Sequence, residues 1–230
     1  MAEQSELLEL FRAYNPDVWP LPIVAYVIGI AVLAFIALRP SRAVDRLASG
    51  FVALMWLWLG IVFQGMYARD VNPTLGVTYA VIFVVEAALI ARTGIFQARL
   101  TFRPRANVAT VVGALAIIYA LVVYPLLGIA LGHAYPEAAL FGAAPCPTTI
   151  VTFGLFLVAR PPVPRHLLTI PLIWAVLAPL AAVPQGVVED SGLFVVGIVA
   201  SALIVIRDRA RSIARSTPVL VPTPRQGGPS

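Results

Sequence analysis

Long apolar stretches alternate with short polar segments along most of the chain. Seven of these stretches come close to the roughly 17 to 25 residues that a helix needs to cross a bilayer. They cover residues 19–38, 48–67, 75–91, 107–127, 146–159, 167–184 and 191–206. The fifth is the shortest, and a re-entrant hairpin is the alternative there. The pattern predicts an all-α, polytopic membrane bundle of seven transmembrane helices.

The composition agrees with a membrane protein. About 60% of the residues are hydrophobic and 12% are charged, whereas roughly a quarter of the residues of a soluble domain are charged. The chain therefore has too little polar surface for a soluble domain of its length.

The placement of charge predicts the orientation, because loops rich in Arg stay in the cytoplasm. With seven spans and the N-terminus outside, all but two of the basic residues fall on the cytoplasmic side, and Arg12 and Arg69 remain outside. Glu137, Glu189 and Asp190 fall on the outer side with most other acidic residues. Six spans would put the Arg-rich C-terminus outside. We therefore expect seven spans in the inner (cytoplasmic) membrane, with the C-terminus in the cytoplasm.

The two ends of the chain have separate expected roles. Residues 1–18 lack the positive start of a signal peptide and predict an outer interfacial helix that ends at Asn15-Pro16. Residues 19–206 form the transmembrane domain. Residues 207–230 begin with the basic "RDRARSIARS", which predicts a juxtamembrane helix over anionic lipid, followed by a disordered tail.

The absence of lysine removes several mechanisms. All sixteen basic residues are arginine, so a retinal or pyridoxal-phosphate (PLP) Schiff base and a P-loop nucleotide site are excluded. The chain also has no CxxC or HExxH motif, and it offers no basic face for nucleic acid. Its single cysteine excludes an intramolecular disulfide.

The outer loop before the fifth span, "GHAYPEAALFGAAPCPTT", concentrates reactive side chains. Pro147 suits a first helical turn, which puts Cys146 at the N-cap and Thr148 and Thr149 at the positive end of the helix. A thiolate at Cys146 could meet His133, as weak ligands for a metal or as a nucleophile with its base. The alternatives are a packing cysteine and a histidine that caps carbonyl groups.

A second polar line follows the third span. Asn72, Tyr79 and Glu86 are spaced seven apart and therefore share one helix face. Gln64, with Tyr119 or Tyr124, is a candidate to meet this face. Such a line could carry a proton or bind a cation, although Asn72 before Pro73 also fits an ordinary helix N-cap.

These motifs are similar to those of an uncharacterised bacterial multi-pass membrane family, domain of unknown function 6064. The resemblance covers Tyr14 to about Ile204 and is most specific from His133 to Thr149. The family pattern G-H-x-Y-P, then F-G, then P-C-P-T-T, is matched by the following residues: Gly132, His133, Tyr135, Pro136, Phe141, Gly142, Pro145, Cys146, Pro147, Thr148 and Thr149. The resemblance implies a functional outer loop without naming an activity, and the family's frequent glutamine at the position of Glu86 argues against a proton carrier there.

Three functions are therefore compatible with the sequence. The first is the binding or passage of an ion or small polar solute at the outer mouth of the bundle, which predicts a hydrated cavity joining Cys146 to Glu86. The candidate contacts are His133, Tyr135, Cys146, Thr148, Thr149, Asn72, Tyr79 and Glu86. The second is a thiol or metal enzyme using Cys146 and His133. The third is a non-catalytic membrane assembly subunit.

Overall fold

The computed structural model describes residues 6–216, with the side chains of residues 6–212. Its helical segments are α1 (Glu6–Asp17), α2 (Leu21–Leu38), α3 (Arg42–Trp58), η1 (Leu59–Ala68), α4 (Arg69–Val71), α5 (Pro73–Ile90), η2 (Ala91–Phe96), α6 (Val108–Ile118), η3 (Tyr119–Val123), α7 (Tyr124–Ala130), α8 (Pro145–Val158), α9 (His166–Ala182), η4 (Val183–Gln185), η5 (Val188–Asp190) and α10 (Ser191–Ser216). Residues 6–216 contain no extended strand, so the predicted all-α fold is confirmed. The predicted tail at 217–230 lies outside the described residues.

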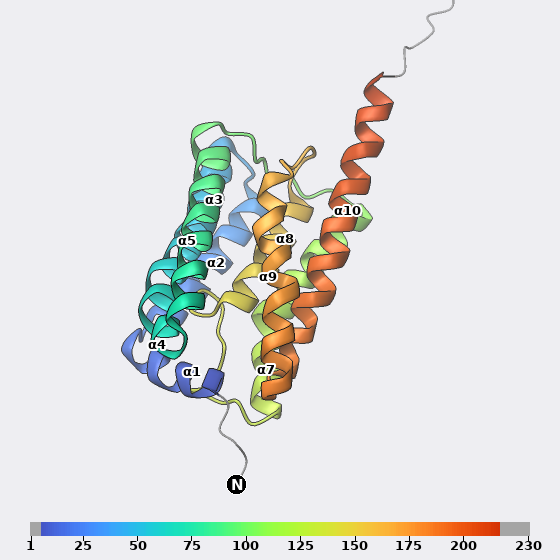
Figure 1. Cartoon of the computed structure of the whole chain (residues 1–230). Helices are drawn as coiled ribbons and strands as arrows, with labels where there is room; N and C mark the ends of the chain where they lie inside the picture. Colours follow the sequence, from blue (N-terminus) through green and yellow to red (C-terminus); the bar gives the residue numbers. More distant parts are fainter. Residues whose placement is uncertain (1–5, 217–230) are drawn as a thin grey trace, which may run out of the picture.

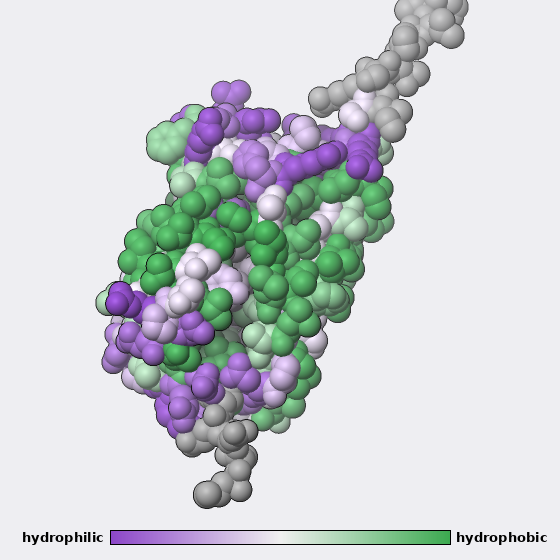
Figure 2. Space-filling view, viewed as in Figure 1, coloured by the Kyte–Doolittle hydropathy of each residue, from purple (hydrophilic) through white to green (hydrophobic). Residues whose placement is uncertain are grey.

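Six continuous helical stretches are long and apolar enough to cross a bilayer: Leu21–Leu38, Arg42–Val71, Pro73–Phe96, Val108–Ala130, His166–Gln185 and Val188–Ser212. They correspond, within two residues at the start of the first and one at the start of the fourth, to the first four and the last two predicted spans. Figure 2 shows a hydrophobic belt between two hydrophilic ends of the molecule. The chain is a multi-pass membrane protein whose apolar helices contact lipid.

The fifth apolar stretch forms α8, a single helix of 14 residues rather than a re-entrant hairpin. At about 1.5 Å per residue this is about 21 Å, short of the roughly 30 Å hydrocarbon core. Every residue of α8 is buried, and the helix packs against α3, α6, α9 and α10. Length alone therefore does not establish a seventh span, and α8 is the central helix of the bundle.

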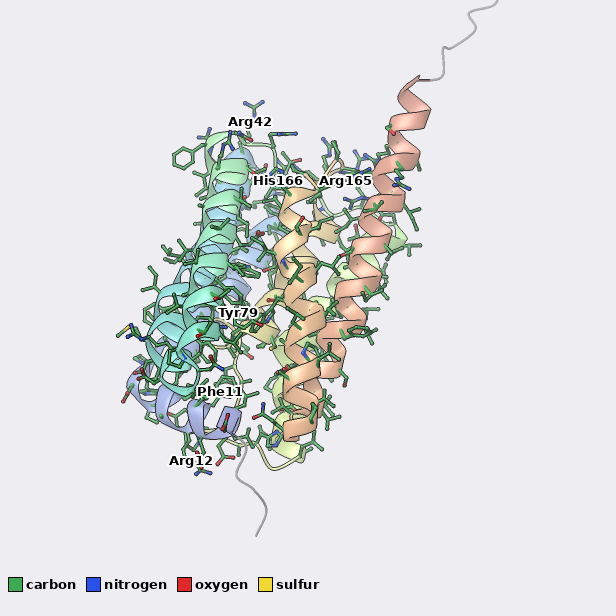
Figure 3. The ribbon with its side chains drawn as sticks, viewed as in Figure 1. Phe11, Arg12, Arg42, Tyr79, Arg165 and His166 are labelled. Atoms are coloured by element: carbon green, nitrogen blue, oxygen red, sulfur yellow. The ribbon has the colours of Figure 1, made fainter. Side chains whose placement is uncertain are left out.

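The two polar ends differ in charge. In Figure 1, α1 lies across the lower end, and α10 extends beyond the bundle at the upper end. Figure 3 places Arg42 and Arg165 at the upper end and Arg12 at the lower end. We call these the arginine end and the α1 end. The two termini of the described chain therefore lie at opposite ends of the bundle.

Local side chains set the starts of several helices. Ser41, Asn72 and Asn107 each accept a hydrogen bond from a backbone N–H three residues later, at 3.0–3.2 Å, which satisfies a donor that the first turn leaves free. The helix α1 ends at Asp17, so the predicted end at Asn15-Pro16 was wrong. The buried Asn15 holds this last turn against the outer loop by two hydrogen bonds.

Two glycines bring α6 and α8 together. A Cβ atom on Gly154 would lie 2.5 Å from Cγ1 of Ile117, and one on Gly113 would lie 2.7 Å from the carbonyl oxygen of Gly154. Small residues allow such close backbone approach, the usual way in which membrane helices pack. This contact holds α8 beside the continuous helix Val108–Ala130, which contains α6, η3 and α7. The outer loop connects these two helices, so both of its ends are fixed.

Candidate functional site

The helix α8 begins at Pro145, one residue before the predicted N-cap. Ala144 is extended (φ −108°, ψ 144°) and takes the N-cap position, so Cys146 and Pro147 lie within the first turn. The prediction of Cys146 as N-cap was wrong because first-turn N–H groups have no partner inside a helix, and both prolines fit there. The Cys146 side chain therefore extends from the side of the first turn of α8.

The threonines of the motif are occupied by contacts within the fold. Thr148 Oγ1 accepts a hydrogen bond from the Gly142 N–H at 3.0 Å and donates to the Ala144 carbonyl at 2.8 Å. Thr149 donates to the Pro145 carbonyl at 2.8 Å. Both hydroxyls therefore hold the turn before α8, and their predicted role as ligand contacts has no support from this geometry.

Cys146 and His133 bond two neighbouring carboxylates instead of each other. The Cys146 thiol donates to Oδ2 of Asp190 at 3.2 Å, and Oδ1 of Asp190 accepts from the Tyr124 hydroxyl. Nδ1 of His133 lies 3.0 Å from Oε1 of Glu189. All five side chains are buried. We call Glu189 and Asp190 the acid pair.

Sequence reasoning assigned the acid pair only to the outer side of the membrane. The available signal was two adjacent acids immediately before an apolar helix, where carboxylates are favoured by the helix N-terminus. Their partners lie 44 and 56 residues away in the chain. A local pattern does not reveal such partners.

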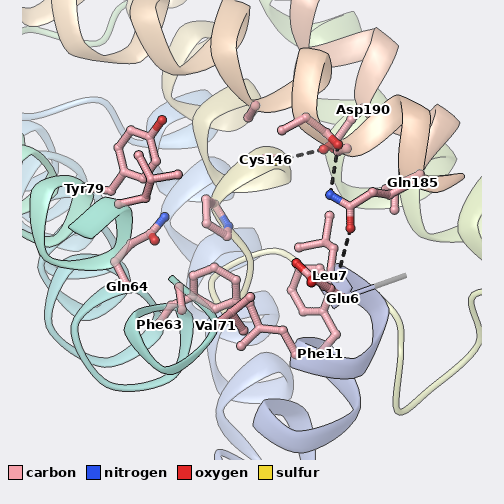
Figure 4. Close-up of a pocket in the computed structure, with 18 of the residues that line it drawn as sticks. Glu6, Leu7, Phe11, Phe63, Gln64, Val71, Tyr79, Cys146, Gln185 and Asp190 are labelled. Atoms are coloured by element: carbon pink, nitrogen blue, oxygen red, sulfur yellow. Dashed lines mark hydrogen bonds between the residues drawn. The ribbon is translucent and has the colours of Figure 1, made fainter. Parts of the chain in front are cut away.

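A cavity of about 190 Å³ opens beside Cys146 between α1 and the bundle (Figure 4). Its polar lining includes Gln64, Asn72, Tyr79, Cys146, Trp174 and Asp190. Its apolar lining includes Leu7, Leu10, Phe11, Phe63 and Leu75. The cavity thus joins the start of α8 to the outer part of the polar line on the third span.

Three polar groups of this cavity have no hydrogen-bond partner among the described residues. The side-chain amide of Gln64 and the hydroxyl of Tyr79 bond no other described group. The indole N–H of Trp174 lies close to the Cys146 sulfur but has no acceptor in hydrogen-bond geometry. Of the three, the Trp174 nitrogen is fully enclosed, where polar groups normally find partners, whereas Tyr79 is only partly buried. A bound molecule that supplied acceptors and donors would satisfy all three.

The remaining candidates lie apart from this cluster. Asn72 caps α5 through Leu75 and also lines the cavity, so it has both a capping role and a place at the cavity. Glu86 is fully buried and does not line this cavity, so the cavity beside Cys146 does not reach it. Tyr135 is 48% exposed and packs against Trp19.

No group of three His, Cys, Asp or Glu side chains within the described part of the chain could hold a metal ion. His133 and Cys146, the weak metal candidates, are each bonded to a different carboxylate. The arrangement is that of a hydrogen-bonded acidic cluster next to a cavity.

The comparisons with known proteins return one match. A family of unknown function, DUF6064, matches residues 4–215. The chain belongs to this family. No curated protein and no solved structure matches it. The part that DUF6064 covers includes α1, the outer loop and most of α10, so the cavity and its cover both lie inside the family region.

In this DUF6064 protein α1 covers the cavity and is anchored at several points. Asn15 Nδ2 donates to the carbonyls of Pro136 and Ala138 at 2.5 and 2.9 Å, and Arg12 forms an ion pair with Glu137. Tyr14 accepts a hydrogen bond from the Trp58 indole at 2.8 Å. Burial raises the pKa of Tyr14 to about 12, so the phenol stays neutral at physiological pH.

Asn15→Ala is expected to expose Cys146. The change leaves two carbonyls without their donor, a loss of about 2 kcal/mol that corresponds to roughly 30-fold more of the open state. Alkylation of Cys146 by a water-soluble maleimide, measured on the DUF6064 protein in detergent, should accelerate by about that factor. Glu9→Gln, on the exposed face of α1, is the control and should react like the wild type. An unchanged rate for Asn15→Ala would show that α1 does not control access to the thiol.

Proposed function

We propose that this DUF6064 protein binds a small solute with an apolar body and a cationic or hydrogen-bond-donating head, in the cavity between α1 and the bundle. The observation that supports the proposal is the pair of unpartnered polar groups on Gln64 and Tyr79, each with an oxygen that can accept a hydrogen bond, around one apolar cavity. Ligand pockets commonly combine an apolar lining with a few convergent polar groups.

The charge of the cavity favours a cationic head. Asp190 and Glu6 are among its lining residues, and no lining residue is an arginine or histidine. Asp190 bonds a thiol and a phenol but forms no ion pair among the described residues. A cation would be drawn to its carboxylate, since attraction between charges is strong where water is scarce.

The size of the cavity limits the solute. An apolar cavity of about 150 Å³ holds one benzene molecule, so the 190 Å³ here suits a molecule with a single ring or a short branched chain. Phe11, Phe63 and Leu75 offer apolar surface to such a body. A bare ion would leave this surface uncovered.

The membrane orientation proposed with this function puts the α1 end outside. Arginine-rich loops are retained in the cytoplasm, which favours the arginine end as cytoplasmic and the bacterial inner membrane as the location. In this orientation α8 is the seventh pass, and solute enters from the outer side. Passage through the bundle would require a path past α8, whose residues are all buried, so binding is the primary role that we propose.

Protection of Cys146 from alkylation tests this function. We expect benzylammonium to slow the reaction of purified protein with N-ethylmaleimide, because its ring fills the cavity beside the thiol and its ammonium group meets Asp190. Neutral benzyl alcohol should protect less. Gln64→Leu should weaken protection by benzylammonium about tenfold, the effect of one lost hydrogen bond to a charged group.

Gln97→Leu, an exposed glutamine outside the cavity, is the matched control and should leave protection unchanged. Equal protection by benzyl alcohol would contradict the cationic head. If neither compound protected Cys146, binding at this cavity would be excluded for molecules of this size and shape.

A further inference from the structure

A second hollow, of about 340 Å³, lies at the arginine end, far along the bundle from the cavity under α1. Four arginines line it, Arg99, Arg105, Arg160 and Arg211, together with Thr101. They come from three separate parts of the chain: the segment after η2, the segment after α8, and α10. We call this hollow the arginine basin.

Backbone contacts hold the walls of the basin in place. The Arg160 N–H donates to the Thr101 carbonyl at 2.8 Å, and Phe102 pairs with Ala159 in an antiparallel bridge. The two connecting segments are therefore fixed side by side. Arg160 and its neighbours are brought together by the fold, although their side chains repel one another.

The acids at this end serve other contacts. Asp45 bonds the Arg103 guanidinium at 2.7 and 3.0 Å and the Phe102 N–H at 2.9 Å. Asp208 bonds Arg207 at 3.0 Å and the Val163 N–H at 2.8 Å. Both carboxylates thus fasten the segments that form the basin, and neither is among the residues that line it.

The four basin arginines have no ion pair among the described residues. Figure 2 shows the hydrophilic surface of this end directly beyond the apolar belt. Guanidinium groups bind phosphate oxygens in a bidentate manner and match their geometry. The four arginines are exposed, and because they share one hollow without a carboxylate they would attract a polyvalent or phosphate-like anion.

We propose that the arginine basin is a phosphate-binding site. Its ligand is a phosphate group, carried either by the headgroup of an anionic lipid or by a soluble phosphate compound. The site is independent of the solute cavity, because it shares no lining residue with it. Failure of one proposal leaves the other standing.

The test measures binding to the purified full-length protein in neutral detergent. Three probes are titrated while thermal unfolding is followed: dioleoylphosphatidylglycerol, dioleoylphosphatidylcholine and inorganic phosphate. Phosphatidylglycerol should stabilise the protein and phosphatidylcholine should not, since its choline group cancels the charge. The double variant Arg105→Gln, Arg160→Gln should bind phosphatidylglycerol about 100-fold more weakly. Each lost hydrogen bond to a charged group accounts for about a tenfold effect.

Arg39→Gln with Arg42→Gln, an equal loss of charge outside the basin, is the matched control and should bind like the wild type. Binding of inorganic phosphate would support the site with a soluble ligand, and binding of phosphatidylglycerol alone would support it with a lipid headgroup. An equal loss in both double variants would overturn the proposal in favour of diffuse surface charge. Stabilisation by phosphatidylcholine to the same extent as phosphatidylglycerol, or by none of the probes, would also overturn it. The rate of Cys146 alkylation should be unchanged in all variants, which verifies their fold.

Discussion

Gly142→Ala is expected to lower the free energy of unfolding by about 3 kcal/mol. Gly142 has φ +81°, a conformation that costs an L-residue roughly 1–2 kcal/mol, and a Cβ atom there would lie 2.3 Å from Cβ of Ala25, an overlap that costs about 1–3 kcal/mol more. Thermal unfolding in detergent is monitored through the reaction of Cys146 with a fluorogenic maleimide. The Tm of the variant should be lower by roughly 6–12 °C.

Gly132→Ala separates the two causes. Gly132 has φ +96°, but a Cβ atom there would meet nothing within 4 Å beyond its own chain neighbours, so this variant should lose only the backbone part, roughly 1–2 kcal/mol. A Tm for Gly142→Ala equal to that of Gly132→Ala would show that α2 yields at Ala25 without cost. A wild-type Tm for both would contradict the turn geometry itself.

Gly142 lies in the outer-loop motif of residues 132–149. Gly142 and Thr148 form a turn that packs Phe141 into the core beside Phe51. Much of the motif is therefore structural, because it positions the start of α8. Two members of the motif, Cys146 and His133, instead bond the acid pair.

The helices and the charge asymmetry of this fold could be predicted from the sequence. A run of about twenty apolar residues has few stable alternatives to a membrane helix, because the bilayer satisfies no backbone hydrogen bonds. Capping by Asn72 followed from the same kind of local rule. Asn72 and Tyr79 both line the cavity, since helix periodicity fixes which residues share a face.

The site itself depended on contacts that local rules do not reveal. Asp190 meets Cys146 across 44 residues of sequence, and α1 covers the cavity through contacts to a loop 121 and 123 residues away. The N-cap of α8 lies at Ala144, two residues before the predicted Cys146, because burial and first-turn geometry together outweighed the preference of a residue before proline for extended backbone. Tertiary packing decided each of these features.

Glu86→Leu is expected to raise the free energy of unfolding by about 2–3 kcal/mol, the scale on which an ionisable side chain opposes burial at the centre of a membrane helix. Both carboxyl oxygens of Glu86 are buried without a hydrogen-bond partner among the described residues, and the residue is 0% exposed. Leucine fills a similar volume without the polar atoms. The Tm in detergent should rise, while the exposed Asp70→Leu should leave it nearly unchanged.

Ligand binding by Glu86→Leu should be measured together with its stability. The solute cavity does not include Glu86, so Glu86→Leu should leave the protection of Cys146 by benzylammonium intact. A lower Tm for Glu86→Leu would contradict the prediction and indicate that the carboxyl group has a bound partner, such as a water molecule or a cation. A higher Tm with intact binding would mean that the chain keeps an acid at a measurable cost in stability, which is typical of a residue retained for function rather than for folding.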